Sequence, residues 1–530
     1  MGLTRNYFAK WMSTLLLLLI ILLFFHSSAH AQWTSVTPPT VGDGGRWMLT
    51  GVHFSSATEG WAVGFNQDRY IGVLLHYQNG TWTSVNPPDV NGDYYLTAVH
   101  FTSADEGWAV GSDSLNRRGV LLHYQSGFWT LVDSPTVSAN WELDGVHFTS
   151  AAEGWAVGYN NANARGVLLH YLNGTWTSVT PPTVSSSWYL SGVHFSSATE
   201  GWATGSDSTN RRKVLLHYVN GAWTLDTLSS STRNWTLHGV HTTSVLQGWA
   251  VGLDITNVKG VLVHLYSGVW TEVDNPPAVS DNWNLNGVHF TSENEGWAVG
   301  SDLRNSRGVL LRCNGWDWTL VTSPTVSESW ELNGVHFTSA AEGWAVGYDV
   351  ENFRGVLLRY LAVSPNKGTI GTRLTLTGSD FGTRKGKVLI GDTPVKIISW
   401  ESSAVTCEIK KALAPGSHNV VIQPKTPRGA LAITHSGAFT MMAPEIQVVK
   451  PPSGGSKTTI LLSGMFLGNK KGRIYLGDKK CRILSWSMNA TTGEGGIQFM
   501  VPDKMTPKLY SLTVTNKVGS VTLTDGFIIP

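Results

Sequence analysis

The chain has 530 residues, of which only 14% are charged, and its formal net charge at pH 7 is +1. This length exceeds one ordinary hydrophobic core, so two to four domains are expected. From residue 361 onward, 21 Lys and Arg stand against 9 Asp and Glu; the preceding part has 17 against 28. The later basic residues are scattered, which favours a solvated surface over a site for an anionic polymer. Abundant Gly (57) and Trp (24) indicate short strands and tight turns rather than helices.

Residues 1–31 predict an export signal. Arg5 and Lys10 provide positive charge, residues 13–25 are almost purely apolar, and Ala29-His30-Ala31 supplies a cleavage pattern. The apolar run is shorter than the ~20 residues of a membrane span. We therefore expect a mature chain that begins at Gln32, has no membrane span, and is secreted, periplasmic or held at the cell surface.

A Gly-Trp-Ala-(Val/Thr)-Gly motif then recurs at a period of 47 residues, with one step of 48. Such a period is typical of a repeat architecture. The first repeat predicts four short strands, over 49–54, 61–64, 72–77 and 81–85, and four antiparallel strands of this length form one propeller blade. The motif tryptophans are Trp61, Trp108, Trp155, Trp202, Trp249, Trp297 and Trp344.

The two ends of the repeat region predict a closed ring. The seventh repeat lacks its fourth strand, and a spare copy of that strand, residues 33–36, follows the signal. Pairing the spare strand with the last blade removes an exposed sheet edge. The predicted fold class is therefore all-β, with a closed seven-bladed propeller over 32–361, in which 32–36 close the last blade.

An aromatic residue ends each crossover between blades. Rigid rings near a channel mouth could stack on sugars or on apolar groups of a partner. The alternative, favoured by their regular repetition, is that they are wedged between neighbouring blades. The candidate ligand-binding residues are Trp47, Tyr95, Trp141, Trp188, Trp235, Trp283 and Trp330.

Two further sets of polar residues repeat with the blades. The first pairs an aspartate after the motif strand with an arginine at the start of the third strand, which favours a structural brace over a ligand contact. The second is one histidine per first strand; seven equivalent ring positions are generally too far apart for a metal site, so we expect no metal and structural hydrogen bonds. The sets are Asp113, Asp207, Asp254, Asp302 and Asp349; Arg118, Arg165, Arg212, Arg307 and Arg354; and His53, His100, His147, His194, His241, His289 and His336.

The remaining reactive residues give no catalytic pattern. Cys313, Cys407 and Cys481 are too few and too dispersed for a disulfide framework, so burial as small hydrophobic residues is expected. No nucleophile elbow, zinc-protease motif or phosphate-binding loop is present. Residues 226–233 and His241-Thr242-Thr243 depart from the repeat without forming a recognisable site.

These motifs carry two resemblances. The repeat with its Gly-Val-Leu-Leu-His-Tyr strand resembles bacterial propellers of the photosystem II stability-factor and BNR-like group. Residues 362–444 and 445–530 each resemble an IPT/TIG domain, through Gly386–Gly391 with Ile398-Ser399-Trp400, and Gly472–Gly477 with Leu484-Ser485-Trp486. That resemblance implies immunoglobulin-like sandwiches that act as spacers or docking modules.

The expected function is an exported, non-enzymatic binding protein. The propeller would bind an extracellular or envelope protein or a glycan at its variable crossover face. We expect no cofactor, no nucleic acid partner and a monomer. Two alternatives stay open: an extracellular polysaccharide-active enzyme with accessory domains, and an assembly scaffold of the envelope.

Overall fold

The computed structural model describes residues 32–42, 44–78, 80–90, 92–226, 233–378, 381–425 and 432–530. The predicted signal peptide lies outside the described residues. Within these ranges all regular structure is β-strand, which confirms the all-β fold class. In the same ranges no helix has the length and apolar character needed to cross a bilayer.

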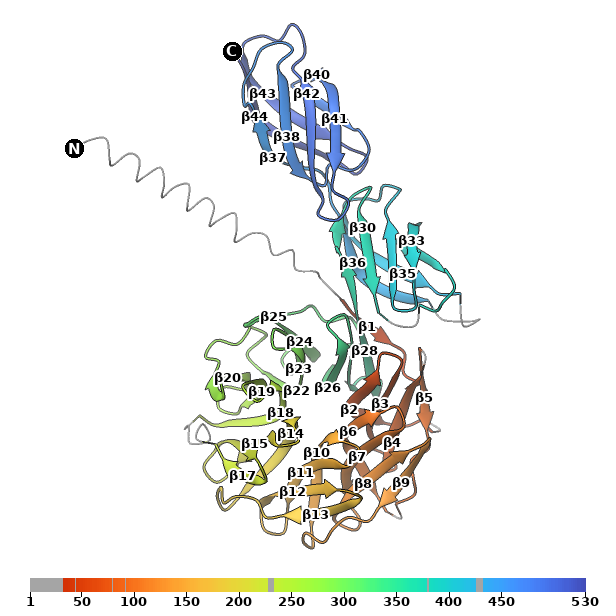
Figure 1. The fold of residues 1–530 in the computed structure, drawn as a ribbon, viewed down its shortest axis with the longest axis vertical. Helices are drawn as coiled ribbons and strands as arrows, with labels where there is room; N and C mark the ends of the chain where they lie inside the picture. Colours follow the sequence, from red (N-terminus) through yellow and green to blue (C-terminus); the bar gives the residue numbers. More distant parts are fainter. Residues whose placement is uncertain are drawn as a thin grey trace, which may run out of the picture.

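Four-stranded antiparallel sheets, here blades 1 to 7, surround a central channel (Figure 1). The inner strands are β2 (Trp47–Ser56), β6 (Tyr94–Ser103), β10 (Trp141–Ser150), β14 (Trp188–Ser197), β18 (Trp235–Ser244), β22 (Trp283–Ser292) and β26 (Trp330–Ser339). The second strands are β3 (Glu59–Asn66), β7 (Glu106–Asp113), β11 (Glu153–Asn160), β15 (Glu200–Asp207), β19 (Gln247–Asp254), β23 (Glu295–Asp302) and β27 (Glu342–Asp349). The third strands are β4 (Ile71–Gln78), β8 (Arg118–Gln125), β12 (Arg165–Leu172), β16 (Arg212–Val219), β20 (Lys259–Tyr266), β24 (Arg307–Asn314) and β28 (Arg354–Ser364). The outer strands are β5 (Thr81–Val85), β9 (Phe128–Val132), β13 (Thr175–Val179), β17 (Ala222–Leu225), β21 (Val269–Glu272), β25 (Asp317–Leu320) and, in blade 7, β1 (Gln32–Val36).

Strand β1 closes the ring as the outer strand of blade 7. It pairs antiparallel with β28, with Trp33 opposite Tyr360. The Trp33 side chain is fully buried and meets Trp297 of blade 6 edge to face, with ring centroids 5.2 Å apart. The N-terminal strand thus contributes to the packing between two blades as well as to one sheet.

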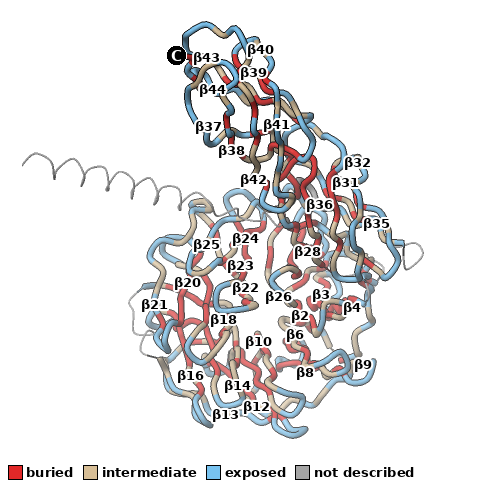
Figure 2. The backbone as a smooth tube through the Cα atoms, turned by 45° about the horizontal axis from the view of Figure 1, so that its top comes forward, coloured by how far each residue is buried: buried red, intermediate tan, exposed pale blue. Residues whose placement is uncertain are grey.

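The repeated motif is explained by packing between strands. Trp61 is 2% exposed and stacks on Phe101 of the next blade, with ring centroids 5.7 Å apart. A Cβ at Gly60 would lie 2.5 Å from the Phe54 ring, and one at Gly64 would lie 1.9 Å from the Met48 carbonyl oxygen. Both glycines are therefore needed because the inner strand lies directly against the motif strand. Figure 2 shows this burial in each blade, with exposed loops at the rim.

Side chains of one inner strand bind the backbone of the next across the channel wall. The Thr50 hydroxyl donates to the Leu96 carbonyl at 2.9 Å, and the Asn333 amide donates to the Leu49 carbonyl at 2.9 Å. Because the second of these bonds joins blade 7 to blade 1, it runs across the closure of the ring. These bonds satisfy backbone groups that the inner edge of a sheet would otherwise leave unpaired.

Two β-sandwiches follow the propeller and extend from it in a line (Figure 1). One sheet of the first contains the end of β28, β30 (Arg373–Thr377), β34 (Ala404–Glu408) and β33 (Lys396–Trp400); the other contains β29 (Lys367–Gly368), β36 (Ile433–Met441), β35 (Gly416–Gln423), β31 (Lys387–Ile390) and β32 (Thr393–Pro394). The second has β37 (Glu445–Lys450), β38 (Thr459–Met465), β42 (Glu494–Met500) and β41 (Arg482–Met488) in one sheet, and β44 (Ser520–Ile529), β43 (Lys508–Thr515), β39 (Arg473–Leu476) and β40 (Lys479–Lys480) in the other. Apart from β29, the strand order is the same in both.

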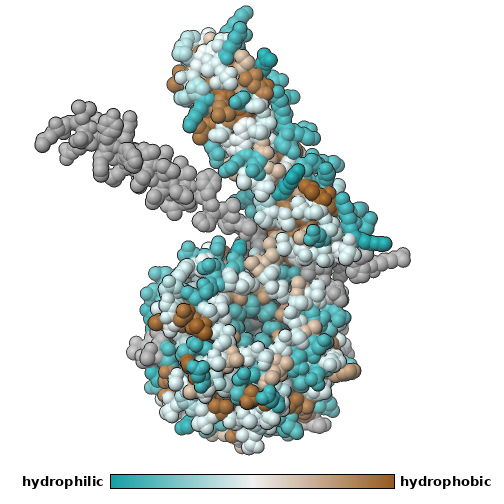
Figure 3. All heavy atoms as spheres, in the orientation of Figure 1, coloured by the Kyte–Doolittle hydropathy of each residue, from teal (hydrophilic) through white to brown (hydrophobic). Residues whose placement is uncertain are grey.

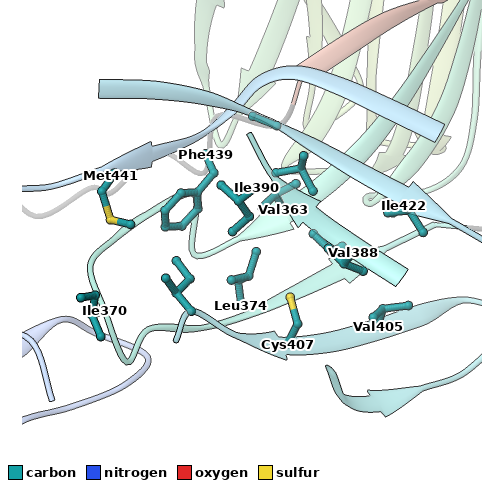
Figure 4. Packing of buried hydrophobic residues seen from close by; sticks show 14 of the residues in the cluster. Val363, Ile370, Leu374, Val388, Ile390, Val405, Cys407, Ile422, Phe439 and Met441 are labelled. Atoms are coloured by element: carbon teal, nitrogen blue, oxygen red, sulfur yellow. The ribbon is translucent and has the colours of Figure 1, made fainter. Parts of the chain in front are cut away.

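Each sandwich has its own core, and the two repeat one internal contact. Figure 4 shows the first core, which includes Cys407. The Trp400 indole donates to the Gly382 carbonyl at 3.0 Å, and the Trp486 indole donates to the Gly468 carbonyl at 2.9 Å. All three cysteines are buried and free, and burial raises each thiol pKa to about 12, so they pack as apolar groups.

Candidate functional site

The structure places the predicted crossover aromatics at the start of the inner strands, with one change of residue. Tyr94, not Tyr95, occupies the position of the tryptophans: Trp47 pairs with Asn66 and Tyr94 with the equivalent Asp113. Because side chains alternate along a strand, Tyr95 turns to the other face and is half-buried. Its hydroxyl donates to a Glu142 carboxylate oxygen at 2.9 Å.

These rings are wedged between blades, and the six tryptophans are only 1–4% exposed. Apart from Trp235, each ring covers a glycine at the start of a third strand in the preceding blade. A Cβ on Gly119 would lie 2.3 Å from the Trp141 ring, and one on Gly166 would lie 2.3 Å from the Trp188 ring. The burial favours the structural interpretation for most of them, and ligand contact by the set stays a prediction.

Blade 4 breaks this rule, because Lys213 stands where the other third strands have glycine. The Trp235 ring therefore cannot lie as the other six aromatics do. Two cations lie close to it, with the Lys213 ammonium 5.1 Å and the Arg233 guanidinium 5.2 Å from the ring centroid. A cation over the face of an aromatic ring is attracted by the quadrupole of the ring.

The backbone hydrogen bond of the crossover aromatic also differs at Trp235. In the other blades the aromatic amide donates to a carbonyl of the preceding blade, as Trp188 N–H does to Ala164 at 2.9 Å. The Trp235 amide donates instead to the Arg233 carbonyl at 2.9 Å. The core clusters of the other six junctions each include a valine of the crossover, namely Val41, Val90, Val137, Val184, Val279 or Val326. Among the described residues, the cluster around Trp235 includes no such valine.

These changes coincide with a recess of about 640 Å³ beside blade 5, here the blade 5 recess. Blade 3 has an equivalent recess of about 230 Å³, and blade 2 one of about 10 Å³. The larger size also reflects one extra residue in the crossover 273–282, the source of the 48-residue step. The blade 5 recess is lined by Arg233–Trp235, by the loop Asp254–Asn257 with Lys259, and by 273–278 with Ser280 and Trp283.

The charged groups of the recess are held in place by a network. Lys213, with no exposed side-chain surface, forms an ion pair with Glu272. Arg233 bridges Glu272 at 3.0 Å and Asp274 at 2.8 Å. Burial lowers the pKa of the Lys213 ammonium, and the hydrogen bond with Asp274 raises the pKa of Arg233. On this wall Arg233 and Asp274 pair with each other, and Glu272 links Arg233 to the buried Lys213.

The opposite wall carries hydrogen-bonding groups of the second-to-third strand loop. Asp254 accepts from the Thr256 amide at 2.9 Å and from the Asn257 side chain at 2.8 Å. Burial acts to raise the pKa of Asp254, but the hydrogen bonds lower it by more than burial raises it. The net pKa is lowered, so the carboxylate is ionised near neutral pH. Lys259 is exposed beside it. In Figure 3 the propeller surface is largely hydrophilic, with hydrophobic atoms over the part where Figure 1 places β19 and β20.

The repeated acids and bases elsewhere form structural pairs. The aspartate–arginine brace is present in blade 4 (Arg212 to Asp207, 2.9 Å) and blade 6 (Arg307 to Asp302, 3.5 Å). The glutamate of the motif turn pairs with the third strand, as His123 with Glu106 at 2.6 Å. Blade 5 differs again, with Gln247 for the glutamate, Thr242 for the phenylalanine and Leu265 for the tyrosine.

Sequence reasoning found the irregular blade but not the site. It marked residues 226–233 and His241-Thr242-Thr243 as departures and left Lys213 unremarked. The useful signal was a lysine at a position where the six other blades have glycine, because an aromatic ring of the next blade covers that glycine. The 48-residue step was a second signal, since it adds a residue to one wall.

Comparisons with known proteins identify one part of the chain. A relative, the cyclomaltodextrin glucanotransferase of Thermoanaerobacterium thermosulfurigenes, is 31% identical over 86 residues, which are 16% of this chain and 12% of that enzyme. The chain thus spans about an eighth of the length of that relative.

Similar solved structures are distant. A Bacteroides thetaiotaomicron VPI-5482 protein of unknown function has a TM-score of 0.38 and 9% identity, covering 62% of this chain and 76% of that one. A surface glycan-binding protein of Prevotella bryantii has a TM-score of 0.17 and 14% identity, covering 30% and 36%. Residues 360–440 match the family model for the IPT/TIG domain, so the chain carries an IPT/TIG domain directly after its propeller.

Proposed function

We propose that this chain is an exported, non-enzymatic binding protein whose propeller binds a glycan in the blade 5 recess. The observation that carries the proposal is the local loss of repetition. Lysine replaces glycine at one junction, the Trp235 amide bonds to Arg233 instead of to the preceding blade, and a recess of about 640 Å³ lies beside Trp235. A volume of this size lies within the usual range of ligand sites, roughly 300–1,000 Å³.

The lining favours a carbohydrate over an apolar ligand. Asn257, Asn275, Asp254 and Lys259 offer donors and acceptors, while two prolines and the rings of Trp235 and Trp283 provide apolar surface. Sugars present hydroxyls at their edges and C–H groups on their faces, so they match a site with both kinds of group. Of the seven aromatics, we propose Trp235, which is 4% exposed, as a ligand contact, whereas Trp283, at 1% exposed, is a structural ring of the wall.

The carboxylates support binding rather than hydrolysis. A glycosidase needs one carboxylic acid whose pKa is raised, so that it can protonate the leaving group. In the recess the pKa of Asp254 is lowered, and Glu272 and Asp274 pair with cations. The two sandwiches then serve as a spacer, and the second is proposed as another IPT/TIG domain.

A glycan array separates this proposal from its alternatives. The chain 32–530 is compared with Asn257→Ala and Lys259→Ala, and with matched controls Asn163→Ala and Arg165→Ala in the smaller blade 3 recess. We expect the blade 5 variants to weaken binding of captured oligosaccharides about tenfold or more, and the controls to bind like the parent. Equal losses in both blades would refute the site. Release of reducing ends from the bound glycan would favour the enzyme alternative.

A further inference from the structure

Seven histidines form a continuous ring around the channel. Each lies opposite the motif tryptophan of its own blade, as His53 is opposite Trp61. Neighbouring imidazole centroids are 4.1–4.5 Å apart, and the contact between His53 and His336, at 4.2 Å, closes the ring. Figures 1 and 2 show the inner strands that carry them around the channel. The spacing brings these rings far closer together than the sequence analysis expected.

The backbone fixes which nitrogen carries the proton. The Phe101 amide donates to His53 Nδ1 at 3.3 Å, the Phe337 amide to His289 Nδ1 at 3.3 Å, and the Thr242 amide to His194 Nδ1 at 3.2 Å. An amide can only donate, so Nδ1 must be the acceptor and the proton of the neutral ring is on Nε2. The backbone thus assigns the tautomer at three of the seven positions. At the other four, Nδ1 is buried and has no hydrogen-bond partner within the described ranges; these are His100, His147, His241 and His336.

No hydrogen bond joins an Nε2 atom of this ring to a described residue, and from this we infer that the Nε2–H groups donate into the channel. Each histidine keeps part of its surface accessible, and the Nε2 atoms are absent from the buried unpaired nitrogens. Burial lowers the pKa of His100 and His241 to about 4 and that of His336 to about 3, so the ring is neutral near pH 7. The charged groups that act on it are other ring histidines, as at His53 and His289.

Neutral N–H donors do not suit a cation. In the described part of the chain no group of histidine, cysteine or carboxylate side chains has the geometry to hold a metal ion. A water molecule accepts only about two hydrogen bonds, whereas a halide accepts several from all sides. Centroids spaced by 4.1–4.5 Å in a seven-membered ring lie about 5 Å from its axis, which is room for a small ion and not for a sugar.

We propose that the histidine ring binds one small monovalent anion, such as a halide, on the axis of the propeller. The anion accepts hydrogen bonds from the few Nε2–H groups that lie nearest to it. This site is separate from the blade 5 recess, so either proposal can fail without the other.

Bromide tests the site directly, because its anomalous scattering identifies it. In crystals of the chain 32–530 grown in sodium bromide near pH 7, we expect an anomalous peak on the axis within hydrogen-bond distance of Nε2 atoms. Bromide should also raise the melting temperature by a few degrees relative to gluconate at equal ionic strength. An axis that holds only water in these crystals overturns the proposal, whatever the variants do.

Variants show whether the ring is responsible. His147→Leu with His289→Leu removes two donors on different sides, because leucine has no N–H group in its side chain. His123→Gln on β8 is the control, since the partner of His123 is Glu106 and not the channel. We expect the bromide-dependent rise in melting temperature to disappear in the double variant and to persist in the control. Persistence in a double variant whose near-ultraviolet circular dichroism is native also overturns the proposal.

Discussion

Replacing Asp144 by asparagine tests how the channel wall is held together. Asp144 occupies the inner-strand position at which other blades place a hydrogen-bond donor toward the next blade. Thr97 donates there to the Leu143 carbonyl at 2.9 Å, and Asn286 donates to the Leu332 carbonyl at 2.8 Å. An ionised carboxylate has no proton to donate. Burial, with a smaller contribution from Glu142, raises the pKa of Asp144 to about 7.

The size of the effect follows from the linkage between protonation and folding. An unfolded aspartate titrates near 3.9, so the folded state holds its proton over a window of about three pH units. Below pH 4 both states are protonated and no penalty arises; between about pH 4 and 7 the folded state loses stability, and above that the loss is constant. Three units correspond to at most about 4 kcal/mol. Because the carboxyl keeps some contact with the channel, we expect about 2 kcal/mol.

Urea denaturation at pH 4, 5.5, 7 and 8.5 measures the difference in free energy of unfolding between the Asp144→Asn variant and the parent. Asp144→Asn should be more stable than the parent by about 2 kcal/mol at pH 8.5 and nearly equal to it at pH 4. The titration of other groups cancels in the difference. Asn286→Asp is the matched control and should show the opposite trend, losing stability as the pH rises. A gap that does not vary with pH would refute the reasoning.

Two further substitutions test the closure and the buried ion pair. Trp33→Ala removes a fully buried ring from the junction of blades 6 and 7, and should cost about 3–5 kcal/mol in chemical denaturation; an unchanged midpoint would show that β1 does not close the ring. Glu272→Gln leaves the Lys213 ammonium buried without its carboxylate and should lower stability by about 3 kcal/mol, and adding Lys213→Met should recover most of the loss in thermal melts. Failure of the second change to recover stability would contradict the ion-pair interpretation.

Most of the fold could be predicted because the information is local and repeated. The motif glycines and Trp61 recur with their neighbours, so the same contact is encoded once in each of the seven repeats. The incomplete last repeat and the spare strand at Trp33 pointed to closure without any structure. The choice of Tyr95 over Tyr94 was wrong in register, because two adjacent aromatics look alike until the strand pairing assigns each a face.

The candidate site was harder to predict because it depends on contacts between blades. A lysine at 213 is unremarkable in its own strand. It matters because Trp235, 22 residues later, would otherwise cover that position. The closeness of the seven histidines was underestimated for the same reason. The distance between equivalent residues depends on how closely the inner strands approach the axis.

The sequence by itself determined the strands, their order in each blade, and the residues that repeat, because period, turn chemistry and alternation are properties of neighbouring residues. Tertiary structure alone decided which departures have consequences. The blade 5 recess is lined by Trp235, whose surroundings are changed by a lysine of the preceding blade. The histidine ring exists because closure brings seven distant residues within van der Waals contact of their neighbours.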